Sequence, residues 1–280
     1  MDSALKRLAR RAIPRGLRNR LRSPALSFQW WLEERRPPVR YAVRPDWSIT
    51  APRNAVWSAF RLQVDDPEQA AEFDDFVRVI RGQPRSLLLD IGCHFGLFSF
   101  AAVHYGGAGS AALAIDPSSE AERMVRRVSA LNGCDKKIQF VRAAAGAENG
   151  ELQMVETGVT GAGYMVLPSD HPDSERVRIP LRTIDSLAES WGRTPTVVKI
   201  DVESYEFEAA LGGAKTLAGA SIPLCVELHN EMARGRGADP AALLDLLRDL
   251  GYRNFCQGSR ALERQEMLDH PLIRVVAKRA

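Results

Sequence analysis

The chain has 280 residues, of which 45% are hydrophobic and 26% are charged, and its formal net charge is +3. This length allows one large α/β domain with an extension, or two small domains. No apolar run reaches the roughly 20 residues that a membrane-spanning helix needs. The composition therefore excludes an integral membrane protein of the helical type and is typical of a globular protein.

Basic residues are concentrated at the N-terminus. Residues 1–40 hold 11 Lys and Arg against 3 Asp and Glu, whereas the remainder holds 27 basic and 32 acidic residues. We therefore expect no nucleic-acid channel through the main part of the chain. The four cysteines are far apart and include no Cys-x-x-Cys pair. This pattern indicates reduced thiols of a cytoplasmic protein rather than a zinc site or a disulfide framework.

The first residues form a basic amphipathic segment. Residues 4–13 place apolar side chains on one helical face and Lys and Arg on the other, and Phe28, Trp30 and Trp31 follow. Such an arm, residues 1–31, could lie peripherally on the anionic inner surface of a membrane. The alternative is a solvated arm that packs on its own domain or on a partner.

Residues 1–66 are interpreted as this arm and an irregular lead-in that contains a strand pair, and residues 67–280 as the main domain. The main domain opens with a predicted helix over residues 67–81. Apolar stretches then alternate in a β-α-β-α-β order that is typical of an open parallel sheet. The predicted strands are 87–91, 111–115 and 138–141, and the predicted helices between them are 96–105 and 119–131.

The second half of the domain continues the alternation. Ser119 and Glu122 are expected to form a capping box at the start of their helix, and Asp239 is expected to cap another helix that has Pro240 in its first turn. Residues 157–176 are rich in glycine, proline and small polar residues, which predicts a loop that could cover an acceptor. The further elements expected are helices over 183–191, about 206–217 and 240–250, strands over 196–201 and 222–228, and an antiparallel closing pair over 251–257 and 271–277.

The central motif is Asp-x-Gly-x-x-x-Gly, formed by Asp90, Gly92 and Gly96 directly after a buried strand. A dinucleotide fingerprint would place a glycine where Cys93 and His94 stand, and an acid before the turn would repel a pyrophosphate. S-adenosylmethionine fits better, because it has a nucleoside but no phosphate and carries an ammonium group that Asp90 could bind. The alternatives are a glycine turn that serves only the fold, and a nicotinamide-dependent oxidoreductase.

A second acid ends the next predicted strand. Asp116 lies 24 residues after Gly92, where α/β nucleotide-binding folds place a carboxylate on the ribose hydroxyls. An acid at a helix N-terminus, favoured there by the helix dipole, is the simpler alternative. We expect Asp116 to bind the ribose.

Seven short motifs are spread over about residues 86–257. They are Leu89-Asp90-Ile91-Gly92, Gly96-Leu97-Phe98-Ser99, Asp116-Pro117, Leu131-Asn132, Thr183-Ile184-Asp185-Ser186-Leu187, Val198-Lys199-Ile200-Asp201-Val202-Glu203 and Glu227-Leu228-His229. In these motifs the sequence resembles the FkbM-type family of S-adenosylmethionine-dependent methyltransferases. Compared with the usual family pattern, Ser204 replaces a glycine, Asp116 replaces a glutamate, and Cys93-His94 replace Ala-Asn.

The resemblance implies a Rossmann-like class I methyltransferase fold, with a mostly parallel sheet of seven strands whose last strand is antiparallel and with helices on both faces. It also implies methyl transfer from S-adenosylmethionine to a hydroxyl group of a sugar, a glycan or another natural product. A module that binds the cofactor without catalysis is the competing interpretation. The expected cofactor-binding residues are Asp90, Gly92, Cys93, Gly96, Phe98, Asp116, Pro117 and Ala144.

Polar side chains gather at the carboxyl ends of the middle strands, where an acceptor could be reached. We expect His229 or Glu203 to be the general base and Asp201 and Glu227 to orient the acceptor. Structural roles remain open for His229, as a hydrogen-bonded residue, and for Glu203, as a helix cap. No metal is assigned, although such a cluster of Asp, Glu and His could also hold a divalent cation.

Overall fold

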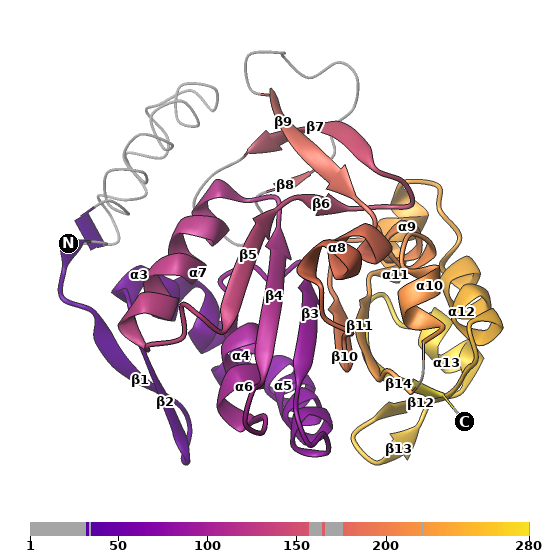
Figure 1. Cartoon of the computed structure of the whole chain (residues 1–280). Coiled ribbons are helices and arrows are strands. Elements are labelled where there is room, and N and C mark those ends of the chain that lie inside the picture. The colour runs from indigo at the N-terminus through magenta and orange to yellow at the C-terminus, as the bar shows by residue number, and fades with distance from the viewer. Residues whose placement is uncertain (1–31, 34, 157–163, 166–175, 220, 280) are drawn as a thin grey trace, which may run out of the picture.

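The computed structural model describes residues 32–33, 35–156, 164–165, 176–219 and 221–279 (Figure 1). These residues form an α/β fold around one large sheet of eight strands. In spatial order the strands are β13 (Arg260–Ala261), β12 (Tyr252–Gln257), β14 (Ile273–Arg279), β11 (Leu224–Leu228), β10 (Val197–Ile200), β3 (Leu87–Ile91), β4 (Ala111–Asp116) and β5 (Ile138–Arg142).

The topology of this sheet confirms the predicted fold class. Strands β10, β11, β3, β4 and β5 are parallel, whereas β14 lies between β11 and β12 and is antiparallel to both. The two-residue β13 extends the seven predicted strands at one edge. The strand order reverses between β3 and β10, and ligands bind at such a point in open α/β sheets, outside the carboxyl ends of the strands.

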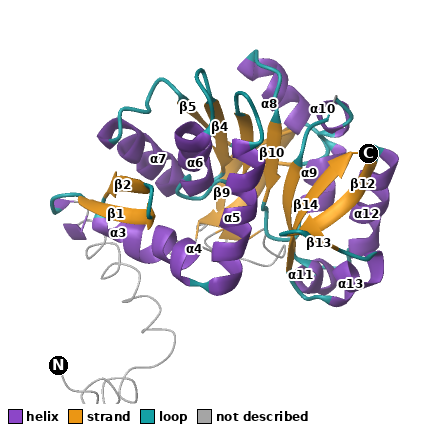
Figure 2. Cartoon of the chain, turned by 90° about the horizontal axis from the view of Figure 1, so that it is seen from below, coloured by secondary structure: helices purple, strands orange, loops and turns teal. Residues whose placement is uncertain are grey.

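Helices cover both faces of the sheet (Figure 2). Alternate side chains of β3 enter two separate cores, because successive residues of a strand point to opposite faces: Leu88 enters one and Leu89 the other. The first core is closed by α5 (Pro67–Arg81), α6 (Leu97–Tyr105) and α7 (Ser119–Leu131). The second is closed by α8 (Ile184–Trp191), α9 (Glu206–Leu211), α10 (Ala214–Leu217), α12 (Pro240–Asp249) and α13 (Arg264–Asp269). The short α11 (Asn230–Gly235) directly follows β11.

The described part of the lead-in packs on the first core. A strand pair is present, as predicted: β1 (Val39–Arg44) and β2 (Trp47–Ala51) are antiparallel. The sequence did not predict the helical stretch that follows, formed by α3 (Arg53–Ala55), the π-helix η1 (Val56–Phe60) and α4 (Arg61–Asp65). Its buried residues include Val56 and Phe60, which join the same core as Phe73 of α5. Apolar residues with the spacing of a π-helix do not follow the α-helical period, which hides this segment from a search for that period.

A second, smaller sheet was not predicted. It lies above the carboxyl ends of β4 and β5 in Figure 1, and its strand order is β6 (Ala144–Ala145), β9 (Arg176–Arg182), β7 (Gly150–Glu156) and β8 (Tyr164–Met165). Most of the predicted acceptor loop, residues 157–163 and 166–175, lies outside the described residues, as does the predicted basic segment, residues 1–31. In the described part of the chain, no helix has the length and apolar character needed to cross a membrane.

A helix cap and a helix break differ from prediction. The N-cap of α7 is Ser118 rather than Ser119, because the Ser118 hydroxyl accepts a hydrogen bond from the Ala121 N–H at 3.0 Å. The helix predicted to continue to residue 217 is divided into α9 and α10. The break occurs at Gly212, where a Cβ would lie 2.1 Å from a backbone carbonyl oxygen of another segment. The predicted cap of α12 by Asp239 is confirmed.

Candidate active site

The turn between β3 and α6 is shaped by two glycines in the left-handed region. Gly92 has φ +80° and Gly96 has φ +79°, conformations that glycine adopts without the steric cost of a Cβ. The N–H groups of Gly92 and Cys93 both donate to the carbonyl oxygen of Ile115, at 2.8 and 2.9 Å. The turn is thereby fixed to the end of the neighbouring strand β4.

The backbone of Asp201 occupies the space beside Gly92. A Cβ on Gly92 would lie 1.7 Å from the Asp201 carbonyl oxygen, and the Asp201 N–H donates to the carbonyl oxygen of Ile91 at 3.0 Å. The close approach that this glycine permits is therefore made by the protein's own chain. The turn after β3 and the segment after β10 form one continuous surface at the strand switch point.

Asp90 lies at the end of β3, beneath the turn. Its side chain is fully buried, and its Oδ2 accepts a hydrogen bond from the Ser99 hydroxyl at 2.6 Å. Burial raises the pKa of this carboxyl group. In the described structure its other oxygen, Oδ1, is buried and has no hydrogen-bond partner. Asp90 fixes α6 to β3.

Asp116 at the end of β4 connects the turn to α7. One carboxylate oxygen accepts from the His94 N–H and the other from the Ser118 N–H, both at 2.9 Å. Burial raises the pKa of Asp116 to about 7, although both hydrogen bonds favour the charged form. The side chain keeps some exposed surface, and each carboxylate oxygen can accept a further hydrogen bond. A ribose hydroxyl could be bound there.

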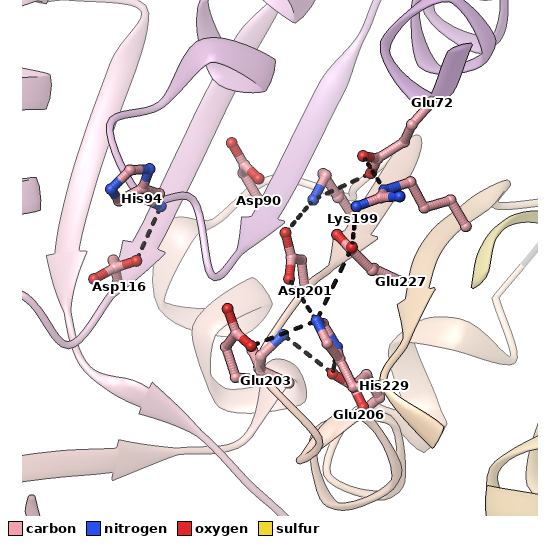
Figure 3. A network of polar contacts seen from close by, with 12 residues as sticks. Glu72, Asp90, His94, Asp116, Lys199, Asp201, Glu203, Glu206, Glu227 and His229 are labelled. Carbon is pink, nitrogen blue, oxygen red and sulfur yellow. Dashed lines mark hydrogen bonds and ion pairs between the residues drawn. The ribbon is translucent and has the colours of Figure 1, made fainter. Parts of the chain in front are cut away.

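Lys199 is a buried cation in the middle of β10 (Figure 3). Its side chain is 2% exposed, and its Nζ lies 3.1 Å from Asp201 Oδ2 and 3.6 Å from Glu72 Oε1. Burial disfavours the ammonium form, but the surrounding carboxylates outweigh it and raise the pKa of Lys199. For Asp201, burial alone would raise the pKa, but the positive charges of Lys199 and His229 outweigh burial and lower it.

Glu227 at the end of β11 has its own cationic partner. Its Oε1 lies 2.6 Å from Arg274 Nη2, and Arg274 Nε also donates to Glu72 at 3.1 Å. Burial, together with the negative charges of Asp201 and Glu72, raises the pKa of Glu227 to about 8. Lys199 and Arg274 thus hold a group of buried carboxylates at the centre of the sheet.

His229 lies at the centre of the candidate site. Its Nδ1 donates to Glu206 Oε1 at 2.8 Å, and its Nε2 lies 3.5 Å from Glu203 and 4.0 Å from both Asp201 and Glu227. Burial favours the neutral ring, but the hydrogen bond to Glu206 and the surrounding carboxylates raise the pKa to about 9. At neutral pH this side chain is a buried imidazolium.

The structure brings together all four residues predicted to be catalytic: Asp201, Glu203, Glu227 and His229. Glu203 is the most exposed of them, with 49% of its side chain accessible, against 23% for Asp201 and 5% for His229. Burial of its carboxyl group raises the pKa of Glu203. Of these four side chains, Glu203 and, to a smaller extent, Asp201 have surface open to solvent.

The sequence model of the protein family described as methyltransferase FkbM domain matches residues 90–254, which is more than half of the chain. The chain belongs to the FkbM methyltransferase family. The family predicted from the sequence is confirmed, and so is the prediction of a methyltransferase with S-adenosylmethionine as its cofactor. A search of curated proteins finds no match.

Similar solved structures include methyltransferase FkbM from Methylobacillus flagellatus KT, with 14% identity, a TM-score of 0.44 and alignment over 80% of this chain. The chain spans 53% of that protein's length. The O-methyltransferase from Bacillus cereus in complex with SAH has 12% identity and a TM-score of 0.44, over 81% of this chain and 87% of that one. The SAM-dependent O-methyltransferase from Thermotoga maritima has 9% identity and a TM-score of 0.43, over 80% and 69%.

Ser204 departs from the FkbM pattern at a position where the backbone needs glycine. Ser204 has φ +83° and the preceding Glu203 has φ +51°, so two successive residues with a Cβ are left-handed. Each such residue costs about 1–3 kcal/mol and persists only where neighbouring contacts hold it. The segment next to the expected base is therefore strained.

The remaining residues assigned to the cofactor have different surroundings. The Phe98 ring packs against aromatic rings of α5 and against Lys199 Nζ, so it is not available to a cofactor. Its backbone N–H lies in the first turn of α6, where N–H groups have no partner within the helix and can donate to a ligand. Cys93 is buried. The Pro117 carbonyl accepts from Arg142 at 3.0 Å, and Ala144 is partly exposed in β6.

A divalent cation has one candidate position among the described residues. One ligand atom each from Asp201, Glu227 and His229 lies within 4.8 Å of the others. Two of these groups already have cationic partners, Lys199 for Asp201 and Arg274 for Glu227, and a protonated His229 offers no lone pair. The donor set therefore fits a cation poorly in this arrangement.

Sequence reasoning missed Glu72 and Arg274, and it did not foresee the role of Lys199. The run Val197-Val198-Lys199-Ile200 could have predicted a buried ion pair, because a lysine inside a buried strand almost always has an acidic partner. Nothing in the sequence indicates that Glu72 is that partner, since it lies 127 positions away on α5. Sequence reasoning also assigned no catalytic role to Glu206, whose carboxylate accepts from the N–H of Ser204 at 3.0 Å.

Proposed function

We propose that the protein transfers the methyl group of S-adenosylmethionine to a hydroxyl oxygen, with Glu203 as the general base. The observation that carries this proposal is the contact between Gly92 and Asp201. It joins the turn predicted to bind the cofactor to the carboxylates predicted to act on the acceptor. A methyl transfer needs both partners aligned at such a junction.

The charge at this edge of the sheet suits the cofactor. S-adenosylmethionine supplies a methyl group on a positively charged sulfonium. Glu203 is exposed and Asp201 partly exposed at this edge, whereas the cations Lys199, Arg274 and His229 are only 2%, 13% and 5% exposed. Asp116 would bind the ribose, and N–H groups of the turn and of the first turn of α6 would complete the site. A pyrophosphate, and hence a nicotinamide dinucleotide, would meet carboxylates instead of a glycine-rich helix start.

The choice of base follows from the protonation of His229. Its pKa of about 9 leaves it charged at neutral pH, so it cannot accept a proton there. About half of the Glu203 side chain is exposed, and the partial burial of its carboxyl group raises its pKa. The raised pKa makes it a stronger base than an ordinary carboxylate. His229 lies 3.5 Å away and stabilises the ionised Glu203. Asp201 and Glu227 would orient the acceptor.

The acceptor that fits is uncharged or cationic. Glu203, the most exposed charged group of the site, would repel a phosphate or a carboxylate placed beside it. Of the acceptor classes that the sequence suggested, the hydroxyl group of a neutral sugar, a glycan or another natural product agrees with this charge.

The test is a methyl-transfer assay with a panel of neutral, cationic and anionic hydroxyl compounds. We expect turnover with neutral or cationic members, and we expect Glu203→Gln to lower kcat by about 10²- to 10⁴-fold. Glu231→Gln, at an exposed position of α11, is the matched control with unchanged kcat. Calorimetric binding of S-adenosylmethionine without turnover of any compound would favour the alternative, a binding module without catalysis.

A further inference from the structure

The strained pair Glu203 and Ser204 is held by contacts from both sides. On one side, Glu206 Oε1 accepts from the N–H groups of Ser204 and Val202, at 3.0 and 3.4 Å. The same oxygen accepts from His229 Nδ1. Glu206 therefore fixes the amide groups of the segment and the imidazole ring with a single carboxylate oxygen.

On the other side, Arg236 holds the carbonyl oxygen of Ser204. Its Nε and Nη2 both donate to this oxygen, at 3.1 and 2.7 Å. Nη2 also forms an ion pair with Glu208 at 2.8 Å, and the guanidinium group stacks at 4.2 Å from the ring centroid of Tyr205. Arg236 follows α11, so it connects the segment after β11 to the segment after β10.

We propose that Arg236 is a positioning residue, which holds Ser204 in a conformation suited to glycine and thereby places the Glu203 carboxylate next to His229. This inference rests on the proposed role of Glu203 as the base. A serine at φ +83° would relax to a negative φ if its carbonyl oxygen were released, because its Cβ disfavours the left-handed region. That rotation would move the adjacent Glu203, whose φ of +51° belongs to the same turn.

The chemistry of the guanidinium group explains why an arginine stands at this position. A planar group with several N–H donors can make two bonds to one carbonyl oxygen, one to a carboxylate, and a stacked contact at the same time. A lysine could supply the charge but could not stack. The arrangement therefore predicts different outcomes for Arg236→Ala and Arg236→Lys.

The first experiment measures hydrogen exchange of the Ser204 amide in the full chain, and it needs no acceptor. We expect Arg236→Ala to accelerate this exchange by at least about tenfold, and Arg236→Lys to have an intermediate effect. Arg234→Ala is the matched control, because Arg234 donates to the carbonyl oxygen of Leu268 outside this segment. Equal protection of Ser204 in all variants would overturn the proposal. If Arg236→Ala does not fold, Arg236→Lys decides by the same criterion.

The second experiment uses rescue. A glycine can stay at a positive φ without Arg236, so the double variant S204G/R236A should keep the geometry that R236A loses. With an acceptor found in the panel, we expect R236A to lower kcat by about tenfold or more while KM for S-adenosylmethionine stays within twofold, and we expect S204G/R236A to restore most of kcat. A loss that S204G does not restore would make Arg236 merely structural. Absence of turnover in the unmodified protein would instead refute the proposed function, while the exchange measurement would still decide the role of Arg236.

Discussion

Gly92 and Asp201 are in direct backbone contact at the point where β3 and β10 end side by side. A Cβ added to Gly92 would lie 1.7 Å from the Asp201 carbonyl oxygen, which is far below any permitted contact. The two strands are paired in parallel register up to Ile91 and Ile200, so their following segments leave the sheet together. This contact sets the distance between the predicted cofactor turn and the expected catalytic carboxylates.

Substitution Gly92→Ala should therefore disrupt both fold and function. The obstructing atom is a backbone oxygen that no side-chain rotation can move, so we expect a loss of more than about 4 kcal/mol in the free energy of unfolding, or no folded protein. Thermal unfolding and calorimetry with S-adenosylmethionine measure the two effects.

Two control glycines separate the clash from the loss of a favourable φ. Gly133 has φ +63°, and Gly235 is not left-handed; a Cβ on either would meet nothing within 4 Å. Gly133→Ala should cost about 1–2 kcal/mol from backbone strain alone, and Gly235→Ala should not destabilise. A Gly92→Ala variant as stable as Gly133→Ala would contradict the described contact.

The buried cation Lys199 should be essential for stability. Lys199→Met would leave Asp201 and Glu72 without their ammonium partner, and removing one member of a buried ion pair costs about 3–5 kcal/mol. Urea unfolding is the measurement, and Lys136→Met, at an exposed position, should change the free energy of unfolding by less than about 0.5 kcal/mol. The double variant K199M/E72Q should recover part of the loss. An equal loss in the double variant would show that packing of the lysine stem, and not charge, is the cause.

Stability should decline on the alkaline side because of His229. The folded protein retains a proton up to a pKa of about 9, whereas the unfolded chain releases it near 6.5. The stabilisation is therefore complete below pH 6.5 and is lost as the pH rises through about 9, with a magnitude of about 3 kcal/mol. Urea unfolding at pH 6.5 and 9.5 should show this decline in the unmodified protein and a smaller one in His229→Gln, where Glu227, with its pKa raised to about 8, still contributes a loss in this range. His270→Gln, at an exposed position, should retain the full decline, and a decline unchanged in His229→Gln would assign it to other groups.

The alternation of apolar runs predicted most of the fold because the central strands β3, β4, β10 and β11 are buried on both faces. The antiparallel β14 contains a similar apolar run, whereas β12 mixes apolar and polar residues. The small sheet of β6 to β9 was missed although residues 176–182 place apolar side chains at every second position, which is the period of a half-buried strand. Residues 150–156, which form β7, contain no continuous apolar run. No turn next to them predicts that they pair with β9.

The candidate site was predictable only where its residues are close in sequence or end neighbouring strands. Asp201, Glu203, Glu227 and His229 meet because parallel strands end at the same edge. Arg274 could not be predicted, because its partner Glu72 is 202 positions away. Asp90 illustrates the opposite case: the motif was found, but only the structure shows that its carboxylate lies beneath the turn.

Cofactor affinity should depend on Asp116 and on pH. If the ionised carboxylate accepts a ribose hydroxyl, affinity for S-adenosylmethionine should rise severalfold from pH 6 to pH 8, because the pKa of Asp116 is about 7 and the charged form is the better acceptor. Calorimetry should show that Asp116→Ala weakens binding at least about tenfold and removes this rise. Asp135→Ala, at an exposed position, should bind normally. A pH dependence that survives in Asp116→Ala would place the ribose elsewhere.

Methyl transfer should not require a divalent cation. Asp201 and Glu227 could coordinate a divalent cation only if Lys199 and Arg274 gave up their ion pairs and His229 lost its proton. Lys199 and Arg274 would still lie nearby and would repel the added cation. We expect the same initial rate of methyl transfer before and after EDTA treatment, and no rise when Mg²⁺ is added back. A rate that falls with EDTA and returns with Mg²⁺ would show that the carboxylates rearrange around a metal. Calorimetry with Mg²⁺ alone, compared between the unmodified protein and Glu227→Gln, would then locate it.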